Sequence, residues 1–358
     1  MSTFLIIAIL ALGFVIVFQI AKASEYVAIL RGEEKARKQS NRVNGFLLLA
    51  FLIVGLIGVY YCNEVLKGRL LGESASDHGE KIDMMLYITI ILTGIVFVIT
   101  QVLLFWFAYK YQESDTRKSY YFPHNNKLEL IWTVIPAIAL TVLVGFGLFY
   151  WYKITGDAPK NALVVEITGS QFKWEMRYPG RDGILGKKYF KEINEAKSNP
   201  LGQIWDDPAN HDDIVVTGDM PIVVNKPVKL IINAKDVIHD VGLAHFRMKM
   251  DAVPGTPTTM WFTPKFTTAK AKEMWGEDFV YEISCDQMCG KGHYSMRGTI
   301  TVVTQEEFDR WMYSQQPQYY AAFPDKNPAN TPAAPAPVAD SVKVASANTA
   351  AVGTTSMN

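Results

Sequence analysis

Long apolar runs dominate the first 153 residues, and mixed apolar and polar positions follow them. Four of these runs are candidate membrane-spanning helices: 4–21, 45–62, 84–108 and 128–152. A span needs about 20 mainly apolar residues, a length that the last two exceed and the first two nearly reach. We therefore predict two transmembrane helices in residues 1–65 and a transmembrane helical hairpin in residues 80–153. A buried core helix is the alternative for the two shorter runs.

Basic residues between the runs predict the orientation of these helices. They gather in the segment after the first run and in the segment before the fourth, at Arg31, Lys35, Arg37, Lys38, Arg42, Lys110, Arg117, Lys118 and Lys127. Excess Lys and Arg marks the cytoplasmic side of a membrane. The N-terminus and all residues after 153 are therefore expected outside the cytoplasm. The first run has no basic residue before it, so we interpret it as a retained helix and not as a cleaved signal peptide.

Period-two patterns replace the long apolar runs beyond residue 160. Short stretches rich in β-branched and aromatic residues, bounded by Gly, Pro, Asn and Asp, predict strands at 162–169, 172–178, 228–234, 259–264, 279–284 and 297–304. Several short strands without helices between them are typical of a sandwich or barrel. We assign this β domain to residues 154–316, with a polar surface excursion at 180–213 and a short closing helix at 305–316.

The C-terminal segment 317–358 is rich in Pro, Ala, Ser and Thr. Such a composition buries too little apolar surface to order itself, so we predict a disordered tail.

The formal net charge of the whole chain is +0 at pH 7. Nucleic-acid binding requires a basic surface, so we expect no nucleic-acid partner.

Two of the three cysteines lie close together in "YEISCDQMCGKGHYSM", residues 281–296. Cys285, Cys289, His293 and Met296 follow one another at steps of three to four residues. A disulfide between the two cysteines is the simplest interpretation, because disulfides persist outside the cytosol. A disulfide, however, does not use the imidazole or the thioether. Zinc rarely takes a thioether, whereas soft thiolates combined with imidazole and thioether favour copper.

One more ligand is expected from elsewhere in the fold. His239 and His245 lie in "NAKDVIHDVGLAHFRMKMDAVPG", after the predicted strand 228–234. Composition alone does not distinguish these two histidines.

These residues resemble a known family. "DVIH", "MKMDAVPG" and "CDQMCGKGHYSM" are similar to the binuclear copper (CuA) domain of cytochrome c oxidase subunit II, a subunit of haem-copper oxidases. "HNNKLELIWTVIPA" at 124–137 resembles that family's membrane signature, and "GSQFKWEMRYPG" at 169–180 resembles its aromatic stretch. The resemblance covers roughly residues 84–316. It implies transmembrane helices followed by a cupredoxin-like Greek-key β-sandwich, a membrane-anchored α plus all-β fold.

The resemblance also implies a ligand set for two copper ions. The two thiolates would bridge both ions, each histidine would bind one ion, Met296 would be a weak ligand of one and the backbone carbonyl of Gln287 a weak ligand of the other. Because it follows the matched Asp236-Val237 pair, His239 is selected over His245. The complete set is His239, Cys285, Gln287, Cys289, His293 and Met296.

The family resemblance implies a respiratory function. Electrons would pass from cytochrome c through the copper pair to haem in subunit I, where oxygen is reduced to water and protons are pumped. The expected location is the bacterial inner membrane as a multi-pass protein, with the copper domain on the periplasmic side. The two N-terminal helices exceed the family's usual two-helix anchor, and we expect them to pack against another subunit or a partner complex.

Three positions depart from the family pattern. Phe172 stands where the family often has a tryptophan that receives electrons, with Trp174 close by, and we assign both to electron uptake. Core packing is the alternative for these two aromatic residues. Gln287 stands where the family usually has a glutamate whose side chain holds a magnesium ion shared with subunit I. A neutral amide is a poorer ligand for a hard cation than a carboxylate, so the magnesium site is in doubt in this chain. Lys235 stands where an acid is common, so we hypothesise that the donor is an unusual cytochrome, held by a cytochrome-bearing partner complex.

Glu129 lies near the cytoplasmic end of the fourth run. Ionisable groups inside membrane spans are functional candidates, and the matching glutamate of the family lies at the entrance of a proton path. Interfacial snorkelling is the alternative for this residue.

For the whole chain, the competing function is a membrane-anchored copper chaperone, which would bind one copper ion per chain where the oxidase subunit binds two. A quinol oxidase subunit is excluded because it lacks the copper ligands.

Overall fold

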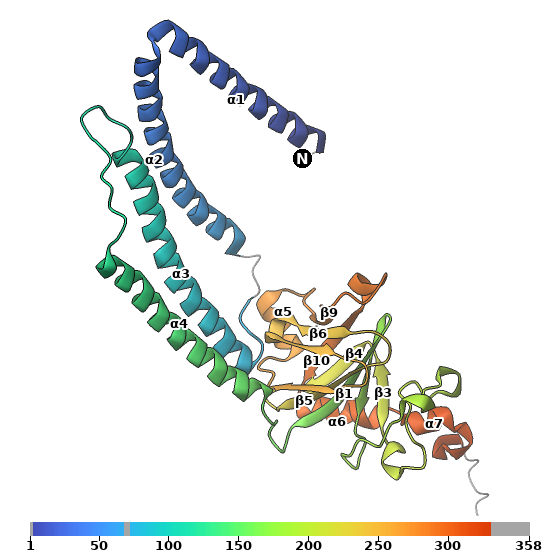
Figure 1. Ribbon diagram of the computed structural model, residues 1–358. Coiled ribbons are helices and arrows are strands. Elements are labelled where there is room, and N and C mark those ends of the chain that lie inside the picture. The colour runs from blue at the N-terminus through green and yellow to red at the C-terminus, as the bar shows by residue number, and fades with distance from the viewer. Residues whose placement is uncertain (1–2, 68–71, 331–358) are drawn as a thin grey trace, which may run out of the picture. The chain divides into compact units, whose positions relative to one another are not determined.

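The computed structural model describes residues 3–67 and 72–330 (Figure 1). Four long helices open the chain: α1 (Thr3–Arg31), α2 (Glu33–Leu66), α3 (Asp77–Lys110) and α4 (Asn126–Thr155). Of the described helices, α2, α3 and α4 are long and apolar enough to cross a membrane, which agrees with the runs at 45–62, 84–108 and 128–152. The run at 4–21 lies in α1, where several side chains fall outside the described part of the chain, and its membrane crossing stays a prediction.

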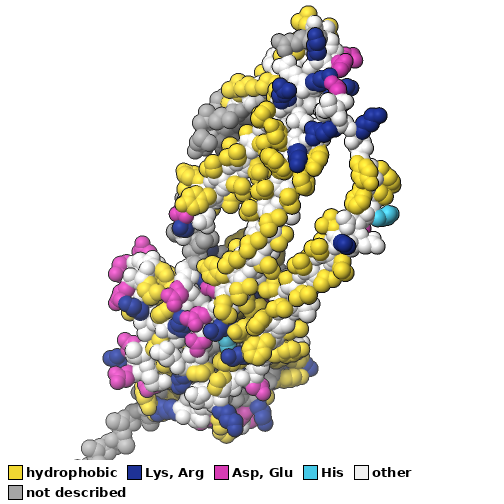
Figure 2. Space-filling model, turned by 90° about the vertical axis from the view of Figure 1, so that its left-hand side faces the viewer, with side chains coloured by type: hydrophobic (Ala, Val, Ile, Leu, Met, Phe, Trp, Pro, Cys, Tyr) yellow, Lys and Arg dark blue, Asp and Glu magenta, His cyan; other side chains and the backbone are white. Residues whose placement is uncertain are grey.

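Apolar side chains cover the surface of the long helices, and Lys and Arg gather where the helices are joined (Figure 2). The additional helix α2 packs against α3 through aromatic pairs such as Phe46–Tyr109, with ring centroids 5.3 Å apart. Its basic first turns also reach the connection between α3 and α4, where Arg37 Nη2 lies 3.4 Å from Glu113 and Lys38 pairs with Asp115. The second helix is thus joined to the hairpin at both apolar and charged positions.

Two five-stranded sheets form the β domain. The first has the order β3-β2-β1-β5-β8 and the second β4-β10-β9-β6-β7. The strands are β1 (Leu163–Ser170), β2 (Lys173–Tyr178), β3 (Ile214–Thr217), β4 (Asp219–Val223), β5 (Val228–Ala234), β6 (His239–Leu243), β7 (Met248–Ala252), β8 (Thr258–Phe262), β9 (Tyr281–Cys285) and β10 (Arg297–Val303). The expected β-sandwich is confirmed. The β1–β5 and β10–β4 pairs are parallel, and the β1–β2, β5–β8, β6–β7, β6–β9 and β9–β10 pairs are antiparallel.

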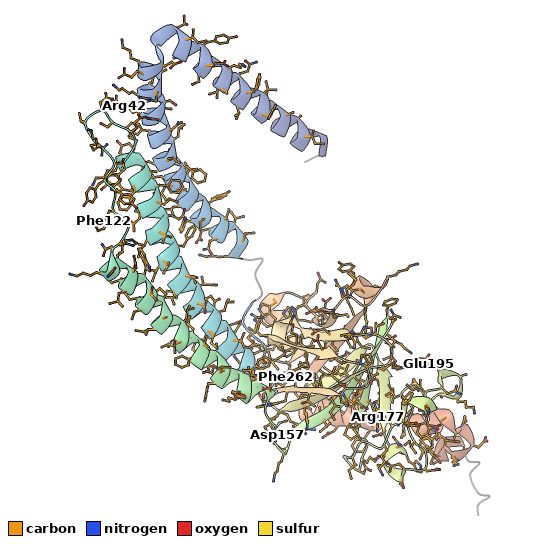
Figure 3. All side chains as sticks on the ribbon, viewed as in Figure 1. Arg42, Phe122, Asp157, Arg177, Glu195 and Phe262 are labelled. Carbon is orange, nitrogen blue, oxygen red and sulfur yellow. The ribbon has the colours of Figure 1, made fainter. Side chains whose placement is uncertain are left out.

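The sandwich core consists of apolar side chains with one buried ion pair. Val165, Ile167, Leu230, Phe262 and Ile300 are at most 1% exposed. Arg177 Nη1 donates to Glu166 Oε2 at 3.0 Å between β2 and β1, and both residues are buried (Figure 3). Removing one partner of such a pair would leave an uncompensated charge, so the pair fixes how these strands combine.

The predicted closing helix is confirmed as α6 (Gln305–Ser314). Thr304 Oγ1 accepts from the Glu307 backbone N–H, and the Glu307 carboxylate accepts from the Thr304 N–H at 2.9 Å. This reciprocal pair is a capping box, which satisfies amide groups that a helix end otherwise leaves without partners.

A second structural unit combines residues 178–215 with residues 313–330 of the described chain. The expected polar excursion 180–213 folds into short 3-10 turns around buried amides, with Asn199 Nδ2 donating to Gln203 O and Gln203 Nε2 to Asn210 Oδ1. The prediction that 317–358 is disordered is wrong for its first part, which forms α7 (Gln318–Ala322) and turns at 324–326 and 328–330. Residues 331–358 lie outside the described residues.

The physical reason for this correction is an aromatic cluster. Tyr319 is 8% exposed, stacks on His211 with ring centroids 4.1 Å apart, and contacts Trp205 and Phe323 at 5.8 and 5.0 Å. The Gln318 N–H also donates to Asp213 O at 2.9 Å. Composition of the tail alone did not indicate this order, because the aromatic partners lie about a hundred residues earlier in the chain.

Candidate metal centre

One β-hairpin and one neighbouring strand supply the candidate ligands. Cys285 is the last residue of β9, and the loop that carries Cys289, His293 and Met296 leads into β10. His239 opens β6, which pairs with β9 in the register Val241↔Cys285. Because of this pairing, a residue 46 positions earlier reaches the cysteine loop.

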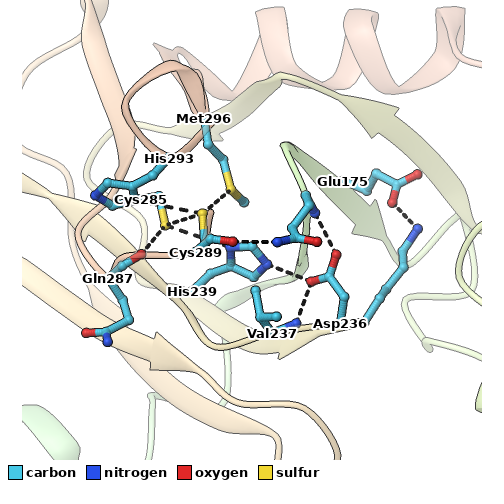
Figure 4. A network of polar contacts seen from close by, with 11 residues as sticks. Glu175, Asp236, Val237, His239, Cys285, Gln287, Cys289, His293 and Met296 are labelled. Atoms are coloured by element: carbon cyan, nitrogen blue, oxygen red, sulfur yellow. Dashed lines mark hydrogen bonds and ion pairs between the residues drawn. The ribbon is translucent and has the colours of Figure 1, made fainter. Parts of the chain in front are cut away.

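The six predicted ligand groups form two similar sets around the sulfur atoms (Figure 4). Cys285 Sγ lies 3.8 Å from His239 Nδ1 and 3.1 Å from the Gln287 carbonyl oxygen. Cys289 Sγ lies 3.8 Å from His293 Nδ1 and 3.8 Å from Met296 Sδ. Each sulfur therefore has one imidazole nitrogen and one weaker donor.

The two cysteines are free, and their Sγ atoms are 3.8 Å apart. A disulfide requires about 2.05 Å, so the structure does not contain the disulfide considered as the simplest interpretation. Among the described residues, the ligand atoms of His239, Cys285 and Cys289 all lie within 4.8 Å of one another. Donors that share one ion at bond lengths of about 2.0–2.3 Å are separated by roughly 3.5 Å, so the spacing fits a metal centre.

The donor chemistry selects copper for this centre. Two thiols, two imidazole nitrogens, a thioether and one carbonyl are mainly soft or borderline donors, which suit copper better than magnesium or calcium. The site is also largely dry, since Cys285, Cys289, His239 and His293 are at most 9% exposed and Met296 is fully buried. The residues present thus fit a copper pair held between the two cysteines.

Asp236 fixes the orientation of one imidazole. His239 Nε2 lies 2.8 Å from Asp236 Oδ1. Burial acts to raise the pKa of Asp236, but hydrogen bonds from the Gln171 and Val237 amides and from His239 outweigh burial and lower it. The carboxylate is therefore ionised and only accepts, so Nε2 carries the proton and Nδ1 is left free to face Cys285.

Gln171 joins this carboxylate to the cysteine loop. Its backbone N–H donates to Asp236 Oδ2 at 2.7 Å, and its Nε2 donates to Cys289 O at 2.5 Å. Sequence reasoning quoted Gln171 and Asp236 within motifs but gave neither a role. The signal available was only their proximity to Phe172 and His239 in the sequence, because both contacts bridge segments far apart in the chain.

Burial, together with the neighbouring Cys285, raises the pKa of Cys289 to about 11, so this thiol favours its protonated form. Metal binding needs a thiolate, so a bound cation must displace the proton of Cys289.

Phe172 lies against the cysteine loop. A Cβ atom added to Gly292 would lie 2.4 Å from its Cγ, and one added to Gly290 would lie 3.1 Å from its Cζ. The ring is 38% exposed. It therefore connects the solvent-facing surface with the loop that carries Cys289 and His293.

Trp174 does not share this exposure, and its role in electron uptake stays a prediction. It is fully buried and pairs with Gly169 in the β1–β2 register. Its ring lies 5.9 Å from that of His239, and a Cβ at Gly169 would lie 2.9 Å from Trp174 and 3.0 Å from His239. Because Gly169 has no side chain, the rings of Trp174 and His239 both fit next to it. Trp174 therefore packs against His239 on the buried side of the metal centre.

His245 and Glu129 lie apart from the copper ligands. His245 packs among aromatic rings, with centroids 4.8 Å from Phe279 and 5.9 Å from Tyr281, which agrees with the choice of His239. Glu129 is exposed in the first turn of α4, whose N-cap is Asn125. Its role in proton uptake stays a prediction.

Two stretches of the chain match one family in sequence. Residues 68–149 match the transmembrane domain of "Cytochrome C oxidase subunit II", and residues 163–303 match its periplasmic domain. Residues 1–67, which hold the two additional helices, precede both matches.

Two curated relatives and one solved structure are similar to parts of this chain. "Alternative cytochrome c oxidase subunit 2" of Bradyrhizobium diazoefficiens is 32% identical over 236 residues, which cover 66% of this chain and 80% of that protein. "Cytochrome c oxidase subunit 2" of Cereibacter sphaeroides is 25% identical over 233 residues, which cover 63% and 73%. The crystal structure of the periplasmic domain of subunit II of cytochrome oxidase of Bradyrhizobium japonicum is 23% identical, with a TM-score of 0.31 and coverage of 44% of this chain and 94% of that one.

Proposed function

Because the chain belongs to the cytochrome c oxidase subunit II family, we propose that its cysteine loop and His239 hold the binuclear copper centre of a haem-copper oxidase. The observation that carries this proposal is the paired arrangement in which each cysteine sulfur faces one imidazole nitrogen and one weaker donor. When bound, the copper pair supplies a one-electron carrier whose charge is shared between two ions.

The residues of the chain have distinct roles in this proposal. The two cysteines and the two histidines would hold the copper ions, and Asp236 would orient His239 by accepting from its Nε2, so that Nδ1 faces Cys285. Gln171 holds the cysteine loop next to Asp236 through one hydrogen bond to each of them. The apolar shell around Met296 excludes water, which limits reorganisation when the centre changes charge.

Phe172 is the proposed position of electron uptake from a cytochrome, because it is an exposed ring that lies against the glycines of the loop. Subunit I then receives the electron and carries out oxygen reduction with proton pumping. Glu129 is proposed to lie at the entrance of a proton path into that subunit. The β domain faces the periplasm, and the proposed location is a bacterial inner membrane that the chain crosses several times.

A magnesium ion shared with subunit I is not part of this proposal. The Gln287 carbonyl faces Cys285, and its side chain is a neutral amide. A hard cation prefers carboxylates, so an ion at this place would need ligands other than the Gln287 side chain.

The test is copper content and electron paramagnetic resonance of the full-length chain, purified in detergent and reconstituted with copper. Two copper ions per chain, with a hyperfine pattern from two equivalent nuclei, are expected. One copper ion with a mononuclear pattern would contradict the proposal and favour the chaperone. Cys285→Ser should abolish the binuclear spectrum, whereas Cys62→Ser, which changes the exposed cysteine of α2, should not alter it.

A further inference from the structure

Four methionines line one cavity of the first structural unit, and we call it the methionine cavity. They come from three elements that are far apart in the sequence: Met85 from α3, Met248 and Met250 from β7, and Met260 from β8. The cavity has a volume of about 660 Å³. Strands β7 and β8 are edge strands of the two sheets and contact each other, so these methionines meet at one open side of the sandwich.

The strand register relates the methionine cavity to the candidate metal centre. Met250 lies opposite Val241, and Val241 lies opposite Cys285. Residues in such a row point to the same face of a sheet, and neighbouring strands are about 4.8 Å apart, so Met250 lies roughly 10 Å from Cys285. Met248 shares this face because it is two residues away in the same strand. Gln287, whose carbonyl oxygen is 3.1 Å from Cys285 Sγ, also lines the cavity.

The sulfur atoms of this cavity suit a soft cation. Met260 is 2% exposed and Met248 is 6% exposed, so their thioethers are shielded from water. Thioethers are soft donors that select Cu(I) over hard cations. Methionine also has three rotatable bonds, so several sulfur atoms can adjust to one ion. The described residues of the cavity include no cysteine, so Cu(I) would be held there by neutral donors.

The charged side chains of the cavity attract a cation. Asp251 and Asp286 line it and are exposed. Of the two basic residues that line it, Arg247 pairs with Asp83 at 2.8 Å, and Lys249 is exposed. The two exposed carboxylates therefore outnumber the exposed lysine. A cavity with such an excess of negative charge raises the local concentration of cations.

On the basis of the proposed function, we propose that the methionine cavity is a loading site for Cu(I), from which the ion passes to Cys285 and Cys289. The transfer exchanges bonds between copper and thioethers for bonds between copper and thiolates, and each thiol that becomes a ligand releases one proton to solvent. No electron moves, because copper remains monovalent. A charged thiolate is a stronger ligand than a neutral thioether, so the exchange runs toward the metal centre. The site is transient, and the filled chain retains two copper ions.

The first experiment removes both cysteines and measures whether Cu(I) still binds. The full-length Cys285→Ser/Cys289→Ser chain, purified in detergent with ascorbate, is titrated with Cu(I) in competition with the chelator bicinchoninate. One Cu(I) ion per chain is expected, and X-ray absorption at the copper edge should show sulfur neighbours without imidazole. Failure to retain Cu(I) would overturn the inference. Copper bound by imidazole would also overturn it, because the ion would then lie at the histidines of the metal centre.

Methionine variants in the same background locate the bound ion. Met250→Leu/Met260→Leu is expected to lower the affinity for Cu(I) by at least about tenfold. Leucine keeps the side-chain volume, so packing is retained and the thioethers alone are lost. Thermal unfolding checks that the variant is folded, and Met85→Leu on α3 gives a second comparison should it not be.

Two other methionines provide the controls for this titration. Met274→Leu changes α5 (Thr268–Trp275), which lies outside the cavity, and Met296→Leu changes the metal centre. Both variants should keep the affinity of the double-serine chain for Cu(I). An equal loss in Met274→Leu, or a loss in Met296→Leu alone, would contradict the inference.

The rate of copper transfer tests the passage to the cysteines. In a Cys62→Ser chain that retains Cys285 and Cys289, stopped-flow absorption follows the formation of bonds between Cu(I) and thiolates. Met250→Leu/Met260→Leu is expected to slow this step by at least about tenfold without changing its final amplitude, because a nearby site raises the effective concentration of the ion. An unchanged rate would overturn the loading role.

Two signals separate this inference from the proposed function. If the reconstituted parent chain lacks the binuclear copper signal while the double-serine chain binds Cu(I) through its methionines, the proposed function fails and the Cu(I) site stands. If the binuclear signal is present but Cu(I) binding to the double-serine chain does not depend on Met250 and Met260, only the loading site fails.

Discussion

Asp236 and His239 form a pair in which the carboxylate holds the Nε2 proton at 2.8 Å, while Nδ1 faces Cys285 Sγ at 3.8 Å. The carboxylate does not contact the metal position, yet it decides which ring nitrogen is available there. Groups of this kind orient metal ligands and raise their basicity.

Asp236→Asn is expected to leave the fold intact and to weaken copper binding by about 10- to 100-fold, the usual effect of removing such a partner. The neutral amide no longer favours protonation of Nε2 over Nδ1. The measurement is a competitive copper titration of the full-length chain. Asp278→Asn, at an exposed position in the same domain, is the control and should keep the parent affinity. Equal affinities in both variants would rule out the positioning role.

Gly292→Ala is expected to destabilise the β domain by about 1–3 kcal/mol, the range for overpacking a close contact. The added Cβ would lie 2.4 Å from Phe172 Cγ, so the ring or the loop must move. The free energy of unfolding comes from denaturant titration of the metal-free chain. In a double-mutant cycle, Phe172→Ala should remove most of the penalty of Gly292→Ala. If the two substitutions changed the free energy of unfolding additively, the contact with Phe172 would not be the cause of the destabilisation by Gly292→Ala.

The stability of the metal-free chain should depend on pH through Asp240. Burial, with Asp251 nearby, raises the pKa of Asp240 from 3.8 to about 7. A raised carboxyl pKa means that the folded state favours the protonated form. Its stabilising contribution is complete below about pH 4 and is lost as the pH rises through about 7.

Asp240→Asn is therefore expected to raise the melting temperature of the metal-free chain at pH 8 and to change it little at pH 4. Thermal unfolding monitored by circular dichroism at both pH values tests this. Asp157→Asn, an exposed carboxylate shown in Figure 3, should leave the melting temperature unchanged at either pH. A gain for Asp240→Asn that is larger at pH 4 than at pH 8 would refute the assignment.

Glu129→Gln is expected to slow turnover of the oxidase complex by about tenfold or more, since a proton-transfer group contributes at least this factor. Reduction of the copper pair by the donor should not change, because that step moves no proton. Oxygen consumption and stopped-flow reduction measure the two steps separately. Glu33→Gln is the matched control, because Glu33 also lies in the first turn of a long helix. Unchanged turnover in the Glu129 variant would reject the proton-path role.

The parts of this fold that could be predicted from sequence are those with a strong local signal. Strands β1, β2, β5, β8, β9 and β10 are rich in β-branched and aromatic residues, and the predicted ranges overlap all of them. Strands β3, β4, β6 and β7 were not predicted, although β3 and β4 contain β-branched residues. "HDVGL" and "MKMDA" have weak strand propensity, and these segments are strands because they pair with each other and because β6 pairs with β9.

The residues of the candidate site also differ in how far the sequence indicated them. The spacing from Cys285 to Met296 indicated a metal site because those ligands share one loop. The contacts of Gln171 were not visible in the sequence, because they join it to Asp236 and to Cys289, which lie 65 and 118 residues away. The position of the Trp174 ring was not visible either, because nothing in its neighbours indicated that Gly169 leaves room for the ring inside the sandwich.

The register Val241↔Cys285 makes copper content a reporter of strand alignment. Side chains alternate across a sheet, so a slip of one residue between β6 and β9 would turn His239 away from the sulfur atoms while the ligands on the loop kept their places. A misaligned chain would still hold two thiols, an imidazole and a thioether, but only one of its two sulfurs would face a histidine. Newly made chains that pair these strands incorrectly would thus be recognisable by their metal stoichiometry before any defect in respiration is measured.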